Sequence, residues 1–144
     1  MQIEKNLFDL SDFIKERYSS YILFVTGGSN YKNNNGHYSY VLLYKNNKFF
    51  NCKNFDYVKS PNVAIIKGTI DALKHINIHN KKLYIVDASQ IGFKGALKGK
   101  GINYELIKEI LKLCEEKNIE YEEVFIHGGG ELLRNIIRNY INDR

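Results

Sequence analysis

The alternation of hydrophobic and polar residues changes its period several times along the 144-residue chain, and each change marks an expected element. Three runs rich in aromatic and β-branched residues, at 21–26, 38–44 and 48–58, predict β-strands. The link at 45–47 reads KNN, an Asn-bearing turn typical of a hairpin between the second and third strands. We therefore expect an antiparallel unit in the first half of the chain.

Later segments alternate between helical and strand patterns. Apolar residues recur at helical spacing over 60–76, where Ser60 followed by Pro61 is typical of a helix start. Residues 82–89 and 122–127 have the pattern of buried strands. Two further segments predict amphipathic helices, 103–118 and 128–142. Because helices separate the later strands, we expect a mixed sheet with helices on both faces.

The beginning of the chain carries an amphipathic pattern of its own. Four apolar side chains fall on one side of a helix predicted over residues 6–18: Leu7, Leu10, Ile14 and Tyr18. This helix either covers the core of its own domain or contacts a partner or a second copy. We expect an N-terminal helical extension at 1–19 and one domain at 20–144.

Composition narrows the class of protein. Hydrophobic residues make up 44% and charged residues 26%, as in ordinary globular domains. No apolar run approaches the roughly 18 residues of a membrane span, and the N-terminus is too charged for a signal peptide, so we expect a cytoplasmic protein without membrane contact. Cys52 and Cys114 form neither a disulfide framework nor a zinc motif. The net charge of +5 permits a polyanionic partner, although A+T-rich coding DNA would give the same lysine-rich composition.

A glycine-bounded stretch, GGSNYKNNNG at 27–36, follows the first predicted strand and has the polar character of a loop. A dinucleotide-binding fingerprint would place such glycines directly before a helix. A strand follows here instead, which excludes that fingerprint. The glycines at 128–130 do precede a helix, where they form either an anion site or a flexible connector.

The strand-end residues resemble those of the ribonuclease H-like family, of the ribonuclease HI type. Family members show a strand ending in TDGS, a helix carrying a Glu, a strand ending in DS and a strand ending near a His. This chain has TGGS at 26–29, NVAIIKGTIDAL at 62–73, IVDAS at 85–89 and FIHGGG at 125–130, in the same order. The resemblance spans about residues 20 to 142. It implies an α/β fold with a five-stranded mixed sheet, three antiparallel hairpin-linked strands then two parallel ones, flanked by helices, to which the N-terminal helix is added.

The resemblance also implies where a catalytic site would lie. Such enzymes hold two Mg²⁺ ions about 4 Å apart with clustered carboxylates and cleave phosphodiesters in line. Asp87 and His127 match the family's strand-end acid and loop histidine, whereas Gly27 and Ile65 replace two expected acids. The last helix lacks the final expected acid. We expect no resident cofactor, and Asp87 either has a structural role or binds Mg²⁺ or Mn²⁺ weakly.

Nucleic-acid contacts follow from the same resemblance. Ser29 and the backbone beside it could meet a phosphate, and Asn62 stands where the family contacts the 2′-hydroxyls of an RNA strand. Lys94, Lys98 and Lys100 take the place of a shortened basic segment that grips substrate. The alternative for these three lysines is a solvated loop.

Several functional hypotheses remain open. The first is a catalytically inactive ribonuclease H-like domain that binds RNA or an RNA–DNA hybrid. The second is a pseudo-nuclease that serves as a protein-interaction or regulatory module. An active Mg²⁺- or Mn²⁺-dependent endonuclease would need a rearranged site, and Asp71 lies about 9 Å along the helix from Ile65, away from the strand ends. A NYN/PIN-type nuclease opening at Asp87 would need downstream acids that are missing.

Overall fold

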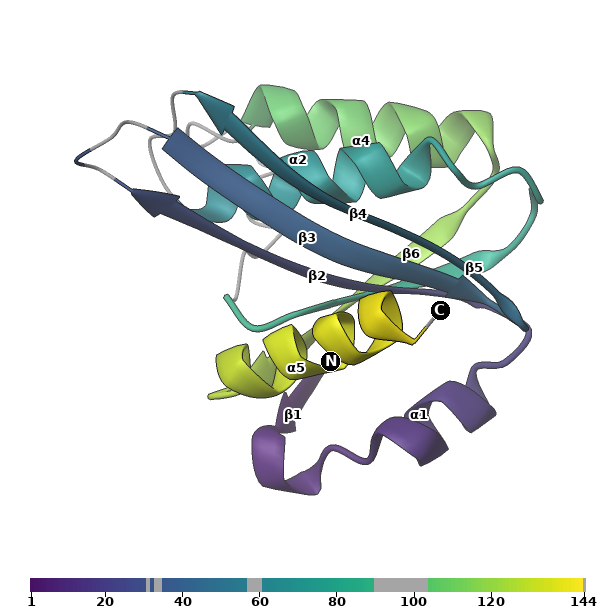
Figure 1. Cartoon of the computed structure of the whole chain (residues 1–144). Coiled ribbons are helices and arrows are strands. Elements are labelled where there is room, and N and C mark those ends of the chain that lie inside the picture. Colours follow the sequence, from purple (N-terminus) through teal and green to yellow (C-terminus); the bar gives the residue numbers. More distant parts are fainter. Residues whose placement is uncertain (31, 33–34, 57–60, 90–103, 144) are drawn as a thin grey trace.

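The structure is a computed structural model of the chain that describes residues 1–30, 32, 35–56, 61–89 and 104–143. It has an α/β architecture in which a mixed six-stranded sheet carries helices on both faces (Figure 1). The strands lie in the order β1-β6-β5-β2-β3-β4. The predicted mixed sheet between two helical layers is therefore confirmed.

The antiparallel half consists of β2 (Tyr21–Asn30), β3 (Asn35–Tyr44) and β4 (Asn47–Asp56). The predicted KNN hairpin is present, and Lys45 adopts a φ of 54° in its tight turn. Strands β2 and β3 continue further than expected, because their ladder runs on to the pair Asn30–Asn35. Backbone groups make these ladder bonds, so polar residues and glycines that predict a loop extend the strands instead.

The remaining elements follow in the expected order. They are α2 (Pro61–Leu73), β5 (Lys82–Asp87), α4 (Tyr104–Glu116), β6 (Glu120–His127) and α5 (Gly130–Asn142). Strand β5 pairs in parallel with β2 on one side and with β6 on the other. The chain thus changes from antiparallel to parallel pairing between β2 and β5, in the middle of the sheet.

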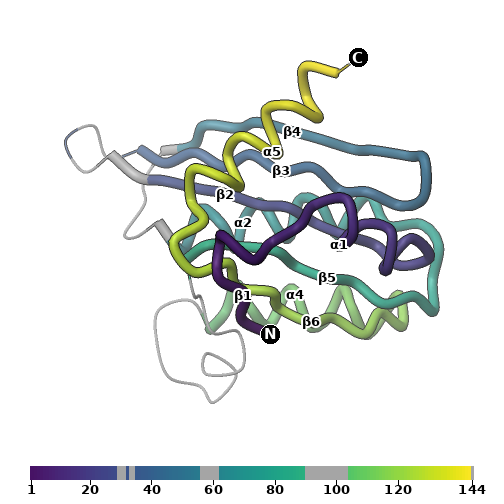
Figure 2. The backbone as a smooth tube through the Cα atoms, turned by 90° about the horizontal axis from the view of Figure 1, so that it is seen from below, coloured from purple at the N-terminus to yellow at the C-terminus, as the bar shows by residue number. Residues whose placement is uncertain are grey.

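Two hydrophobic cores lie on the two faces of the sheet. Helices α2 and α4 cover one face, and α5 together with α1 (Leu10–Glu16) covers the other (Figures 1 and 2). Side chains of a strand alternate between the faces, so Leu23 and Val25 join the α2 core while Ile22 and Phe24 join the α5 core. The same alternation fixes the face of every strand-end residue considered below.

The prediction of five strands was wrong, because residues 2–4 form a sixth. Strand β1 (Gln2–Glu4) pairs in parallel with β6, and the α-amino group of Met1 donates to the carbonyl oxygen of Glu123 at 3.0 Å. A short 3₁₀ turn, η1 (Lys5–Leu7), leads on to α1. Three residues are too few to show a periodic pattern, so β1 has no signal in the sequence.

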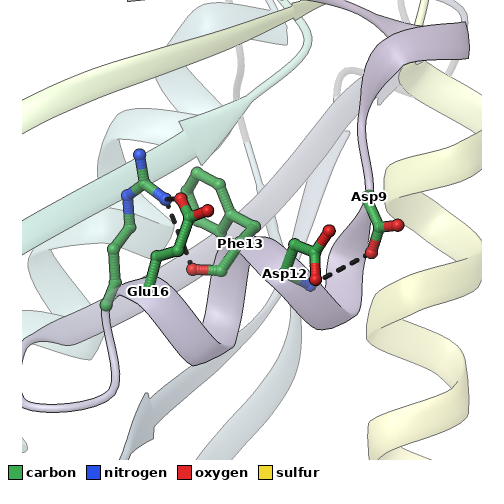
Figure 3. Close-up of polar contacts among 5 residues, drawn as sticks. Asp9, Asp12, Phe13 and Glu16 are labelled. Carbon is green, nitrogen blue, oxygen red and sulfur yellow. Dashed lines mark hydrogen bonds and ion pairs between the residues drawn. The ribbon is translucent and has the colours of Figure 1, made fainter.

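Helix α1 begins at Leu10, later than the predicted residue 6. Asp9 precedes it, and its Oδ1 accepts a hydrogen bond from the backbone nitrogen of Asp12 at 3.0 Å, which caps the helix (Figure 3). Phe13 is buried in the α5 core, and the guanidinium of Arg17 lies 4.0 Å from the centre of its ring. Helix α1 therefore covers the core of its own domain, one of the two roles anticipated for it.

Candidate functional site

Three sequence-predicted positions lie on one face of the sheet, around β2 and the end of β5. Leu83 and Ile85 belong to the α2 core, so alternation places Asp87 on the same face as Gly27. The first turns of α2 lie against this end of β2 and bring Ile65 there, where it is buried. These three positions thus supply one acid, a glycine and an isoleucine.

Gly27 has no space for a side chain. A Cβ atom at this position would lie 2.7 Å from the Cβ of Ala64 and 2.9 Å from the backbone nitrogen of Ile65. Neither atom belongs to a flexible side chain, so an added group could be accommodated only by moving α2. The acid expected here is not merely absent, because the helix occupies the space that it would need.

Asp87 is fully buried at the end of β5. Its Oδ1 accepts a hydrogen bond from the backbone nitrogen of Ser89 at 3.4 Å, two residues further along the chain. Short Asp side chains commonly hold a following turn in this way. Among the described residues, no group of three or more His, Cys, Asp and Glu side chains is placed to hold a metal ion.

His127 lies at the exposed end of β6 and pairs with Glu4. Its Nδ1 lies 3.0 Å from Oε2 of Glu4, and both side chains are more than half exposed. Glu4 is the residue opposite His127 in the β1–β6 ladder. Because β1 itself was not predicted, the sequence analysis missed this partner.

Gly28 and His37 form a contact on the opposite face of the sheet. The two residues are paired across β2 and β3, and a Cβ atom at Gly28 would lie 2.7 Å from Cε1 of the imidazole. The hydroxyls of Thr26 and Ser39 lie 2.9 Å apart on this face. Because the two glycines of TGGS carry no side chains, a helix packs closely against one face of the strand and a histidine ring against the other. The strand itself is continuous through them. The expectation of a loop over residues 27–36 was wrong at residues 27–30, which belong to β2, and at residues 35–36, which belong to β3.

The predicted nucleic-acid residues are only partly described. Asn62 is half-buried in the first turn of α2, beside the strand ends. The backbone of Ser29 pairs with Gly36 in the β2–β3 ladder, whereas its side chain lies outside the described structure. The three lysines of the proposed basic segment also lie outside the described residues: Lys94, Lys98 and Lys100.

A polar cluster that the sequence analysis did not predict surrounds Asp71 of α2. Its Oδ2 accepts hydrogen bonds from the Tyr38 hydroxyl and from Nδ2 of Asn51, each at 2.9 Å. Burial by itself raises the pKa of Asp71, but hydrogen bonds from Asn51 and the tyrosines, with the nearby His75, bring that pKa below its ordinary value. An Asp within a helix that is apolar nearly all round is the signal that could have revealed this cluster.

The same cluster affects its tyrosines. Burial raises the pKa values of Tyr38 and Tyr40 far above the ordinary value, and the negative charge of Asp71 adds to that rise. Both phenols therefore stay neutral at physiological pH, and Tyr38 stays a hydrogen-bond donor to Asp71. The cluster stabilises the contact between α2 and the antiparallel half of the sheet.

No protein-family model matches the chain, and comparison with curated proteins finds no match. The resemblance to the ribonuclease H-like family therefore stays a prediction that rests on residues and their order. In the part of the chain that the structure describes, no helix is long and apolar enough to cross a membrane.

Proposed function

We propose that this chain is a catalytically inactive ribonuclease H-like domain that binds RNA or an RNA–DNA hybrid. The strand order supports the fold assignment. Strands β4, β3 and β2 are antiparallel and hairpin-linked, α2 follows them, and β5 and β6 then add in parallel. This is the arrangement that the resemblance implies, with β1 added at the β6 edge.

The close packing at Gly27 is the observation that carries the inactive assignment. Two-metal cleavage needs several carboxylates from neighbouring elements around one point. Here Ala64 and the backbone of Ile65 fill the space beside Gly27, and Ile65 itself is apolar and buried. Asp87 supplies one carboxylate, which bonds to the turn at Ser89.

Charge supports the nucleic-acid assignment. The chain carries a net charge of +5, and the sequence from 90 to 103, which follows the strand end at Ser89, contains three lysines and no acid. Phosphates attract such a segment without regard to base sequence. Asn62 lies beside the same strand ends and could add a polar contact to a sugar or a phosphate.

A protein-interaction module is the second candidate, and the N-terminal segment favours it. A cavity of about 240 Å³ lies beside η1 and α1, where Leu7 is 74% exposed. Asp9, Asp12 and Glu16 line the same cavity, although the chain as a whole is basic. This combination would suit a partner segment that carries both apolar and basic side chains.

The test combines binding and cleavage. Labelled RNA–DNA hybrid, double-stranded RNA and single-stranded RNA are incubated with the protein and with Mg²⁺ or Mn²⁺. We expect salt-sensitive binding without cleavage. Cleavage that is lost in Asp87→Asn would overturn the inactive assignment, and absence of binding at low salt would favour the protein-interaction module.

A matched pair of triple variants tests the basic segment. Replacing its lysines by alanine (Lys94, Lys98 and Lys100) should reduce the slope of log K against log salt by about 2 to 3, because each lost phosphate contact removes about 0.7 to 0.9. The control removes the same charge from exposed lysines elsewhere: Lys15, Lys74 and Lys112. Equal slopes in the two triple variants would show that binding depends on net charge alone.

A further inference from the structure

Strand β4 and helix α2 together form a row of aromatic and basic side chains at one edge of the sheet. In the β3–β4 ladder, Phe49 lies opposite Leu42 and Asn51 opposite Tyr40. Leu42 and Tyr40 belong to the α2 core, so the odd-numbered residues of β4 point toward α2. We define the β4–α2 ridge as five side chains from β4 and from the α2 segment that it faces: Phe49, Lys53, Phe55, Lys67 and His75.

Contacts along the ridge follow the turns of the helix. The ammonium of Lys67 lies 4.6 Å from the centre of the Phe55 ring, and one turn later Asp71 accepts its hydrogen bond from Asn51. Just past the end of α2, His75 stacks on Phe49 with ring centres 5.5 Å apart and an angle of 13°. The strand and the helix segment thus meet in two ring contacts, one with a lysine and one with a histidine.

The ridge is accessible and basic. Phe49 keeps 37% of its surface exposed despite the stack on His75, and Lys53, four residues further along β4, is also exposed. Among the side chains that the structure describes in this region, the acidic one is Asp71. Its carboxylate accepts hydrogen bonds from Tyr38 and Asn51. Strand β4 is also the last strand in the order of the sheet, so in the described structure no further strand covers its outer edge.

We propose that the β4–α2 ridge binds single-stranded nucleic acid, with a base stacked on Phe49 and phosphates beside Lys53 and Lys67. This inference rests on the proposed nucleic-acid function and names the form of nucleic acid that is bound. Unpaired bases stack on aromatic side chains irrespective of sequence, while basic groups follow the backbone. A closed duplex hides its base faces, so the ridge favours single strands. Lys67 against the Phe55 ring and the exposed Lys53 favour a polyanion over an apolar protein surface.

The chain offers a closely matched control for Phe49. Phe50 is its neighbour on the same strand, is also 37% exposed and lies on the opposite face of the sheet, where Val41 is its ladder partner. We expect Phe49→Leu to weaken the binding of a labelled oligouridylate about tenfold, whereas Phe50→Leu leaves it unchanged. Fluorescence anisotropy measures both affinities, and thermal unfolding checks that both variants are folded.

A second pair of variants reports directly on contact. The chain contains no tryptophan, so Phe49→Trp and Phe50→Trp each introduce a single indole fluorophore. Titration with oligouridylate should quench the indole fluorescence of the Phe49→Trp variant and leave that of the Phe50→Trp variant unaffected. Lys67→Gln should also reduce the salt slope by about 0.7, the value of one phosphate contact on a single strand.

The outcomes separate the ridge from the wider proposal. Suppose that the wild type binds RNA, that the triple lysine variant of the 90–103 segment weakens binding, and that the Phe49 and Phe50 variants behave alike. The ridge assignment then fails while the nucleic-acid function stands. If the wild type binds no nucleic acid at low salt, the proposed function fails, and the ridge assignment fails with it.

Discussion

Replacing Gly27 by alanine adds a single methyl group at the point where β2 meets the start of α2. The new Cβ would lie 2.7 Å from the Cβ of Ala64 and 2.9 Å from the backbone nitrogen of Ile65. Carbon atoms in contact normally lie about 3.5 to 4.0 Å apart, so α2 would have to move by up to about 1 Å. Overpacking of this kind typically costs about 1–3 kcal/mol.

An opposing effect reduces that cost. Alanine restricts the unfolded chain more than glycine does, which contributes about 0.4–1 kcal/mol in favour of folding where the backbone is compatible. Gly27 lies in regular β-ladder pairing with Tyr38, so its backbone suits alanine. We therefore expect a net loss of about 1–2 kcal/mol in the free energy of unfolding, or a fall in Tm of roughly 2–8 °C. Gly27→Asp should cost more, because it also places a carboxylate in the same space.

Urea denaturation, monitored by far-UV circular dichroism, measures this loss in the free energy of unfolding. Gly130→Ala is the control, because a Cβ there would meet only the flexible end of Arg134, at 3.4 Å, and should change stability little. If Gly27→Ala were as stable as the wild type or more so, the space beside Gly27 would be open and the steric argument for the proposed inactive site would be refuted. Metal-dependent cleavage gained by Gly27→Asp would refute it as well.

Two further predictions concern α2. Asp71→Ala should lower the free energy of unfolding by about 2–3 kcal/mol at pH 7, because hydrogen bonds to a charged group contribute about 1.5–3 kcal/mol. The control, Glu109→Gln on an exposed site, should change that free energy little. Because the folded pKa of Asp71 is lowered, its contribution is present above the ordinary carboxyl pKa of about 3.9 and is lost as the pH falls through the folded pKa. The gap between the urea midpoints of wild type and variant should therefore narrow as the pH falls below that ordinary value, and a constant gap would contradict this. Lys117→Met should lower the free energy of unfolding by about 1–3 kcal/mol. The ammonium of Lys117 donates hydrogen bonds to two carbonyl oxygens at and just beyond the end of α2, at 2.7 and 2.6 Å, and the variant loses both. Lys112→Met, on an exposed site, is the control in thermal unfolding, and equal Tm values would contradict that role.

Local patterns determined the order of most elements. Helical periodicity and the Ser60–Pro61 start placed α2, and alternating apolar runs placed the strands of the antiparallel unit. The KNN hairpin could be predicted because a tight turn depends on the few residues within it. The register from Asn30 to Asn35 could not, since it depends on backbone pairing that continues through polar residues.

The sequence also identified Gly27, Ile65 and Asp87 as positions that belong together, but only through their order and a resemblance. Which face each occupies follows from alternation, whereas the distance between Gly27 and Ala64 depends on how closely α2 packs against β2. No local pattern encodes that distance, because it results from the combined packing of many side chains on one face of the sheet.

The sequence by itself thus determined a mixed α/β domain, and it placed a glycine and an isoleucine at positions where the proposed resemblance implies acids. Only the tertiary structure decided that β1 joins β6, that Asp71 binds Tyr38 and Asn51, and that α2 closes the space at Gly27. The physical reason is the range of the interactions. Periodicity and turn chemistry act over a few neighbouring residues, whereas strand pairing, buried hydrogen bonds and steric exclusion join residues that are brought together only when the chain folds.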